Sequence, residues 1–421
     1  MDKNTLSNYG WIVIAVLVLS VMIALATPFG NFIKLGIEST TAGLFNTSES
    51  ALNVVGMSAK NDDNGDSKDE MGTDNNSGTS TPTIDHNGTR IPEGATYTQA
   101  DGTVLNAGDE FPSTVNDGDI YVYDDYEYKY NFCYSGSNWI TPGASYKVTS
   151  TTLNGWGVRV LNTNKTEYGA ILESINSKPI TNMDNTFSAC YDLTTAPAIP
   201  NNVTSMMYTF THCTSLTTAP DMSNANNLTN MTRTFYGCTA LSNASEDIVI
   251  PSNVENMTHT FSECKNLTIA PAIPNNVTNM EGTFYECNSL TDISNLIIPD
   301  NVTSLLYTFA KCNSLTDISN LIIPDGVTNM SSAFWNCISL TSVPTIPSSV
   351  THMVSTFMGC TSLTGNVTIN ANPTYYETSF RNVDFTAQNL TLVGNSTKLD
   401  TLGATGKNYC KTCNGVCNNS H

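Results

Sequence analysis

The sequence predicts an α/β repeat solenoid of short strands and single helical turns, preceded by an N-terminal transmembrane helix and a small all-β module. Three observations predict this fold: a motif that recurs through the second half of the 421-residue chain, an uncharged apolar run near the N-terminus, and a tyrosine-rich stretch of alternating pattern between them. A fixed period of 20–50 residues is typical of stacked repeats, and about 20 apolar residues span a bilayer.

The recurring motif is centred on cysteine. A Phe lies three residues before each Cys, a Leu lies three residues after it, and a Met lies seven residues before it in all units except one, which has Leu305. The repeat core is therefore predicted to be Phe187, Cys190, Leu193, Phe210, Cys213, Leu216, Phe235, Cys238, Leu241, Phe261, Cys264, Leu267, Phe284, Cys287, Leu290, Phe309, Cys312, Leu315, Phe334, Cys337, Leu340, Phe357, Cys360 and Leu363. A period in this range with a Leu framework predicts a solenoid of the leucine-rich-repeat type.

The spacing within a unit predicts its local structure. Met, Phe and Cys are four and three residues apart, which places them on one face of a short helical turn. The segment that follows each Leu is predicted to be extended and to end at a Pro. The solenoid is expected to cover residues 183–385 in about eight units, with a degenerate ninth unit that has Val383 at the Cys position.

Neighbouring segments are expected to close the solenoid. Residues 146–182 are predicted to cap its N-terminal end, and residues 386–421 to form a C-terminal cap with a Cys-rich tail. Such caps are needed because the outermost units would otherwise expose their apolar faces.

The motif resembles the BspA-like leucine-rich-repeat family of bacterial surface proteins. The text that carries the likeness is TFYECNSLTDISNLIIPDNVTSL and its siblings, from Ile180 to Phe385. This resemblance implies a role in adhesion to host matrix proteins and to other cells. The repeat spacing itself predicts only the solenoid.

The N-terminal run GWIVIAVLVLSVMIALA predicts a membrane anchor. It belongs to a segment, residues 1–57, in which the span is expected from Gly10 to Phe32, followed by an amphipathic continuation. A signal peptide cleaved after Ala26 is the main alternative, and a buried core helix is disfavoured because the run is apolar on all sides. The stretch also resembles, loosely, the N-terminal helix of Flp-type pilins.

Two different segments separate this run from the solenoid. Residues 58–90 are rich in Asp, Asn, Gly, Ser and Thr, which predicts a flexible linker. Residues 91–145 alternate between apolar and polar positions with Gly-Asp breaks, which predicts a small β module. Its aromatic row is interpreted as cross-strand packing in preference to a carbohydrate-stacking face; the row comprises Tyr121, Tyr123, Tyr126, Tyr128, Tyr130 and Phe132.

Of the 12 cysteines, eight belong to the repeats, three cluster at the C-terminus, and Cys133 stands alone. Those of the repeats are interpreted as buried thiols that pack as small hydrophobic groups, in preference to redox or metal sites. The C-terminal Cys410, Cys413, Cys417 and His421 have the spacing of a zinc site. A disulfide loop is preferred there in an extracytoplasmic chain, with Cys133 as a further partner, and a tail of free thiols is a third possibility.

Composition limits the function. The formal net charge is -20, with 17 Lys and Arg against 37 Asp and Glu, which excludes the basic surface that nucleic-acid binding requires. No nucleophile elbow, Walker loop or HExxH motif occurs, and no carboxylate pair can be nominated. We therefore expect neither an enzyme nor a cofactor.

The expected function is that of a membrane-anchored extracellular surface protein that mediates adhesion or protein–protein binding. Its regular framework with variable residues between Leu and Pro is typical of solenoids that present an extended binding surface. The expected partners are the membrane, through the N-terminal helix, and host or bacterial surface proteins or glycans. The expected location is the bacterial cell membrane, with one span and the bulk of the chain outside. The alternative is a structural subunit of a pilus-like or surface-layer assembly.

Overall fold

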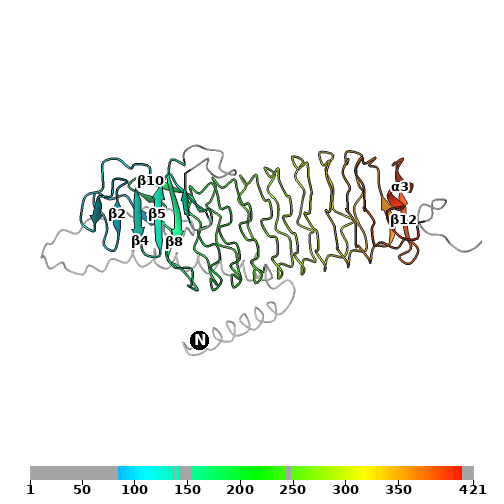
Figure 1. Cartoon of the computed structure of the whole chain (residues 1–421), viewed down its shortest axis with the longest axis horizontal. Coiled ribbons are helices and arrows are strands. Elements are labelled where there is room, and N and C mark those ends of the chain that lie inside the picture. Colours follow the sequence, from blue (N-terminus) through cyan, green and yellow to red (C-terminus); the bar gives the residue numbers. More distant parts are fainter. Residues whose placement is uncertain (1–83, 136–137, 142–152, 243–247, 410–421) are drawn as a thin grey trace, which may run out of the picture. The chain divides into compact units, whose positions relative to one another are not determined.

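The computed structural model describes residues 84–135, 138–141, 153–242 and 248–409 (Figure 1). The chain divides into two compact units, Met1–Ser77 and Gly78–His421. The first unit lies outside the described residues, so the fold that follows is that of the second.

An eight-stranded sheet begins the described chain. Its strands in spatial order are β1 (Asp85–His86), β9 (Ser174–Ile175), β10 (Lys178–Asn182), β8 (Trp156–Val160), β5 (Tyr126–Tyr130), β4 (Ile120–Tyr123), β2 (Thr96–Thr98) and β3 (Val104–Asn106). The pairs from β3 to β8 are antiparallel, whereas β8 and β10 are parallel. Because β5 pairs with β8, the predicted β module and the predicted N-terminal cap share one sheet.

Tyrosines fill the core of this sheet. Tyr121 of β4 lies directly opposite Tyr128 of β5, and the two ring centroids are 6.3 Å apart. Both side chains are fully buried, as is Tyr126. Burial alternates along β5, as expected for a strand with one face in the core. The aromatic row therefore packs across strands, and these three rings are not available to stack on a carbohydrate.

Few other regular elements occur among the described residues. They are the antiparallel pair β6 (Cys133–Ser135) and β7 (Asn138–Ile140), the parallel pair β11 (Gly365–Thr368) and β12 (Leu390–Val393), and the helix α3 (Leu399–Gly403). The last three elements close the C-terminal end of the stacked turns (Figure 1).

From Met183 onward the chain forms stacked turns that are hydrogen-bonded to one another (Figure 1). With the exception of Met280, the backbone N–H groups seven, five, three and one residues before the repeat cysteines donate to carbonyl oxygens of the following turn. Thus Phe187 donates to Thr209 at 2.9 Å and Ala189 donates to Thr211 at 2.8 Å. The N–H groups four and two residues before the cysteines donate three residues back within their own turn. Most of those six residues before the cysteines donate to a side-chain oxygen, as Thr232 does to Asn230 Oδ1. Half of the donors in this segment are therefore used to join one turn to the next.

Two residues of every turn adopt the left-handed backbone conformation, with φ from 52° to 80°. Those five residues before the repeat Cys, or before Val383, are Asn185, Tyr208, Arg233, His259, Gly282, Tyr307, Ser332, Ser355 and Thr378. Those one residue before it are Ala189, His212, Gly237, Glu263, Glu286, Lys311, Asn336, Gly359 and Asn382. An α-helix requires negative φ throughout and donors that bond four residues back. Neither condition holds in these turns.

The predicted α/β solenoid is therefore wrong. The segments expected to be single helical turns are non-helical turns, each of which contains two residues in the left-handed conformation. Within the described ranges α3 is the one helix, and it is five residues long. The predicted N-terminal transmembrane helix is not found either. No helix among the residues that the structure describes is both long and apolar enough to cross a membrane, and the span expected from Gly10 to Phe32 lies outside those residues.

Phenylalanines form a continuous stack through the solenoid. Each repeat Phe is fully buried, and neighbouring rings from Phe187 to Phe380 have centroids 5.2 to 5.9 Å apart. Most of these rings are within about 13° of parallel, an arrangement imposed by the equal register of the turns. We call this stack the phenylalanine ladder.

Loss of one rung of the phenylalanine ladder should destabilise the solenoid strongly. We expect Phe284→Ala to lower the free energy of unfolding by about 3–5 kcal/mol, because it removes a fully buried ring whose space the rigid turns cannot fill. Denaturant unfolding measures the change. The control is Ile297→Ala, whose parent side chain is 73% exposed; this variant should stay within about 0.5 kcal/mol of the parent. Equal losses from the two variants would contradict the burial of the ladder.

The left-handed conformation can be tested at Ser332. This residue has φ 53° and donates its N–H to the carbonyl of Val354. Ser332→Pro should cost about 3 kcal/mol or more, because proline fixes φ near −65° and has no N–H. Ser332→Gly should cost nothing, since glycine adopts positive φ readily. In a helical turn the same Gly change would cost about 0.5–1 kcal/mol. Thermal unfolding of both variants distinguishes the two backbones.

Candidate functional site

The 24 predicted repeat-core residues all lie in the interior of the solenoid with 0% exposure. Each repeat cysteine after the first directs its thiol to the preceding turn. Sγ donates to the carbonyl oxygen of the preceding turn's Phe at 3.0 to 3.2 Å; the donors are Cys213, Cys238, Cys264, Cys287, Cys312, Cys337 and Cys360. The cysteines are free, and burial raises the pKa of the Cys337 thiol to about 12.

A second buried set was missed by the sequence reasoning. The residue directly before the repeat Phe is almost always Thr, and its hydroxyl donates to the carbonyl of the preceding turn's Met at 2.7 to 3.0 Å. These residues are Thr209, Thr234, Thr260, Thr283, Thr308, Thr356 and Ser379. Ala333 interrupts the set. The recurrence of Thr-Phe in the sequence could have revealed it, because a polar residue between two core positions needs a fixed partner.

The surface of the same turns carries a group of aromatic and charged side chains. They occupy positions five, two and one residues before the repeat cysteines. We call the set the aromatic–cation face; it comprises Tyr208, Arg233, Tyr236, Glu263, Tyr285, Glu286, Tyr307, Lys311 and Trp335. All nine side chains are partly exposed. The signal in the sequence is the recurrence of Tyr or Trp two residues before Cys238, Cys287 and Cys337.

Arg233 organises one half of the aromatic–cation face. Its guanidinium carbon lies 5.5 Å from the ring centre of Tyr208 and 5.6 Å from that of Tyr236, so two rings flank the cation. Arg233 Nη1 also donates to the Tyr208 hydroxyl at 3.0 Å. Tyr236 donates in turn to Glu263 at 2.5 Å. That hydrogen bond, together with burial, raises the pKa of Tyr236 to about 12.

Lys311 has the same role in the other half. Its Nζ lies 5.1 Å from the ring centre of Tyr285 and 5.0 Å from that of Trp335, and it forms an ion pair with Glu286. The hydrogen bond to Glu286 raises the pKa of Lys311. Tyr307 packs edge-on against both rings, with centroids 6.3 and 6.5 Å away. Each cation is thus held between two aromatic rings: Arg233 lies between a ring of the preceding turn and one of its own turn, and Lys311 lies between rings of the preceding and following turns.

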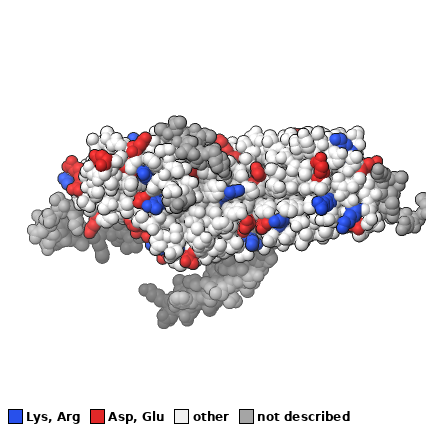
Figure 2. Space-filling view, in the orientation of Figure 1, with Lys and Arg blue, Asp and Glu red and all other residues white. Residues whose placement is uncertain are grey.

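Charge is sparse over the rest of the visible surface. Figure 2 shows scattered basic and acidic side chains on a largely uncharged surface. Large aliphatic side chains are also exposed, in the segments that lead to the repeat prolines: Val249 is 63% exposed, Ile297 is 73% and Ile322 is 79%.

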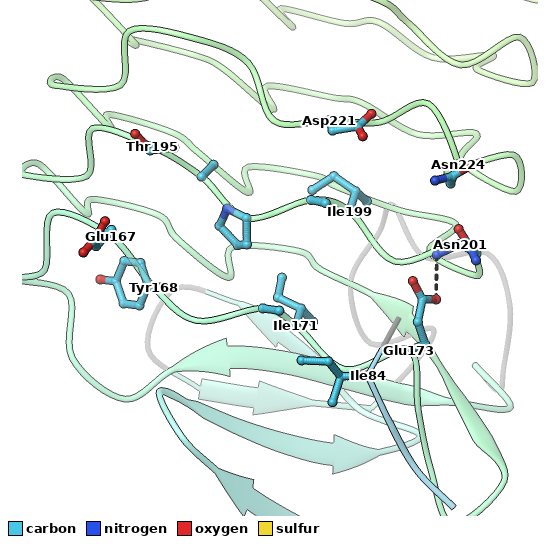
Figure 3. A pocket seen from close by; sticks show the side chains of 14 residues that line it. Ile84, Glu167, Tyr168, Ile171, Glu173, Thr195, Ile199, Asn201, Asp221 and Asn224 are labelled. Carbon is cyan, nitrogen blue, oxygen red and sulfur yellow. Dashed lines mark hydrogen bonds between the residues drawn. The ribbon is translucent and has the colours of Figure 1, made fainter. Parts of the chain in front are cut away.

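A cavity of about 360 Å³ lies where the N-terminal sheet meets the first turns (Figure 3). Its lining comes from Ile84, from residues 167–173, from residues 195–201, and from Asp221 and Asn224. Glu173 is half-buried there and accepts the backbone N–H of Asn201 at 2.9 Å.

The C-terminal candidates for a disulfide or zinc site, Cys410, Cys413, Cys417 and His421, lie outside the described residues. Cys133, their expected further partner, is a free, buried thiol. Burial raises its pKa to about 12, with a contribution from Asp184. Within the described ranges, no cluster of three or more His, Cys, Asp or Glu side chains could hold a metal ion.

The stacked turns with their repeated Phe, Cys and Leu define a solenoid of the leucine-rich-repeat class. Residues 281–403 match the BspA type leucine rich repeat region in 6 copies, so the chain carries a BspA-type leucine-rich-repeat region and the resemblance drawn from the sequence is confirmed. Residues 159–273 match a second family, described as a Mycoplasma protein of unknown function, DUF285. The chain is thus a repeat protein of a class that binds other proteins.

Three solved bacterial structures are similar to parts of the chain. The leucine-rich repeat protein TpLRR of T. pallidum is 21% identical with a TM-score of 0.37, over 49% of this chain and 90% of that one. A leucine-rich repeat protein from Bacteroides ovatus is 17% identical with a TM-score of 0.34, over 65% and 90%. One from Eubacterium ventriosum is 17% identical with a TM-score of 0.31, over 57% and 74%. At these scores the likeness adds nothing to the chain's own geometry. No curated protein matches the chain significantly.

The buried thiols predict a labelling pattern. In the native chain a maleimide reagent at pH 8 should leave Cys213 through Cys360 unmodified, because the thiols are buried and burial raises their pKa. Under denaturing conditions every one should react. Peptide mass spectrometry assigns the label to each position. Ile297→Cys is the matched control, because a thiol at this exposed site should react in the native chain. Rapid native labelling of Cys287 would contradict the packing described.

Proposed function

We propose that the protein is a cell-surface adhesion protein that binds partner proteins through the aromatic–cation face. The observation that carries this proposal is the pair of cations held between rings, Arg233 between Tyr208 and Tyr236 and Lys311 between Tyr285 and Trp335. Tyr, Trp and Arg are the residues that most often dominate the binding energy of protein interfaces.

Rigidity supports the proposal. The backbone of each turn is hydrogen-bonded to the next, and Tyr208, Arg233, Tyr307 and Lys311 are themselves left-handed residues of that framework. Side chains that are already ordered lose little conformational entropy when a partner binds. A preorganised face of this kind favours binding without rearrangement of the solenoid.

Charge on the face favours a partner of mixed polarity. Glu263 and Glu286 lie beside the two cations, bonded to Tyr236 and Lys311 respectively. Neither sign of charge dominates, so a strongly charged polymer has no advantage over a protein that presents its own aromatic and polar groups. Binding rather than catalysis agrees with the general use of this repeat class as a scaffold. The alternative of a pilus-like subunit depended on the N-terminal run, which lies outside the described residues.

Alanine substitution tests the face. The full chain should bind saturably to immobilised extracellular-matrix proteins, to mucins or to whole cells. Arg233→Ala and Trp335→Ala should each weaken that binding by at least about 2 kcal/mol, or about thirtyfold in Kd, if they are centres of the interface. Surface plasmon resonance measures the change.

The control for this experiment is Tyr191→Ala, because Tyr191 is an aromatic side chain that is 56% exposed and lies outside the face. Its Kd should equal that of the parent. Unchanged binding by both face variants, with the solenoid folded by circular dichroism, would remove the support for this surface. No saturable binding to any of the three targets would contradict the adhesion function itself.

A further inference from the structure

The cavity beside the N-terminal sheet has an apolar floor. Ile84, Ile171 and Ile199 lie between the polar ends of the cavity and come from three separate segments of the chain (Figure 3). Pro197 and the neighbouring alanines also line it. With about 360 Å³ of space, the cavity falls in the size range of small-molecule sites. An apolar recess of this size favours an aliphatic group over water.

Carboxylates border this floor. Glu167 and Glu173 lie at opposite ends of the cavity, and Asp221 lies beyond Ile199 (Figure 3). The lining includes no Lys, Arg or His, and none of the three acids belongs to an ion pair among the described residues. Acidic groups around a recess of low dielectric raise the local concentration of cations.

Glu173 is the acid most affected by this environment. It is half-buried, and one carboxylate oxygen accepts the Asn201 N–H while the other has no hydrogen-bond donor among the described residues. Burial, with a further contribution from Asp85, raises the pKa of Glu173. A cation at this position would offset the cost of keeping the carboxylate charged.

We infer that the cavity binds a cation carried on an alkyl chain, such as the ammonium end of a lysine side chain or of a free diamine. The aliphatic stem lies on Ile84, Ile171 and Ile199, and the cationic head reaches the carboxylate of Glu173. Long cationic side chains bind in this manner, with the methylene groups on apolar surface and the charge at its edge. The inference does not depend on the aromatic–cation face, because the two surfaces share no residue.

Three small probes test this site on the full chain by NMR titration. Nα-acetyl-lysine N-methylamide and cadaverine each carry an ammonium group on an alkyl stem, whereas Nα-acetyl-norleucine N-methylamide has the stem without the charge. At least one amine should bind saturably with a Kd on the order of 1 mM, and the norleucine probe should bind about tenfold more weakly, because it lacks the charge-assisted hydrogen bond. Binding by the lysine probe points to a partner protein, and binding by cadaverine alone points to a free diamine.

Glu173→Gln should weaken amine binding by about tenfold while the chain stays folded, because the amide oxygen can still accept the Asn201 N–H. Glu377→Gln is the matched control: it makes the same change at an exposed position away from the cavity, and its affinity should equal that of the parent. The inference is overturned if neither amine saturates, if the norleucine probe binds as tightly as the amines, or if Glu173→Gln leaves their affinity unchanged.

Discussion

The hydrogen bonds between successive turns are the constraint on which the rest of this structure depends. Four N–H groups of a turn, at alternating positions from Met to the residue before Cys, reach the next turn only because two residues of that segment are left-handed. The same bonds fix the register of the turns. Because the turns are in register, the Phe rings stack, each Cys thiol after the first meets a carbonyl oxygen, and the buried Thr hydroxyls find their acceptors.

The aromatic–cation face is a product of this register. Side chains at equal or adjacent positions of neighbouring turns lie beside one another. Arg233 therefore meets Tyr208 of the preceding turn, and Lys311 meets Trp335 of the following turn. A left-handed conformation costs about 1–2 kcal/mol for a residue with a side chain, yet Tyr208, Arg233, Tyr307 and Lys311 all adopt it. The bonds between turns and the buried ladder offset that cost, so the conformation of the surface residues depends on the same contacts as the core.

The repeat core could be predicted from the sequence because periodicity reports which residues are buried. Phe284, Cys287 and Leu290 are buried as their spacing implies. Periodicity could not exclude the helical turns, because Met, Phe and Cys spaced four and three residues apart are buried equally well in a helix and in a turn that contains left-handed residues. Backbone conformation at Glu286 or Lys311 leaves no mark in the sequence, since neither residue type favours positive φ. The cavity was equally hidden, because Ile84, Ile171 and Ile199 meet only in the folded chain.

Each turn offers the next turn the same donors, acceptors and ring, so successive turns are interchangeable. Residues 288–300 and 313–325 have the identical sequence NSLTDISNLIIPD in consecutive turns, which is the mark expected of a copied unit. A whole turn can be gained or lost without a new junction having to evolve, whereas half a turn cannot. Selection can therefore change the length of the solenoid by one turn at a time. Each added or lost turn changes the distance between the two end caps and leaves the caps themselves unchanged.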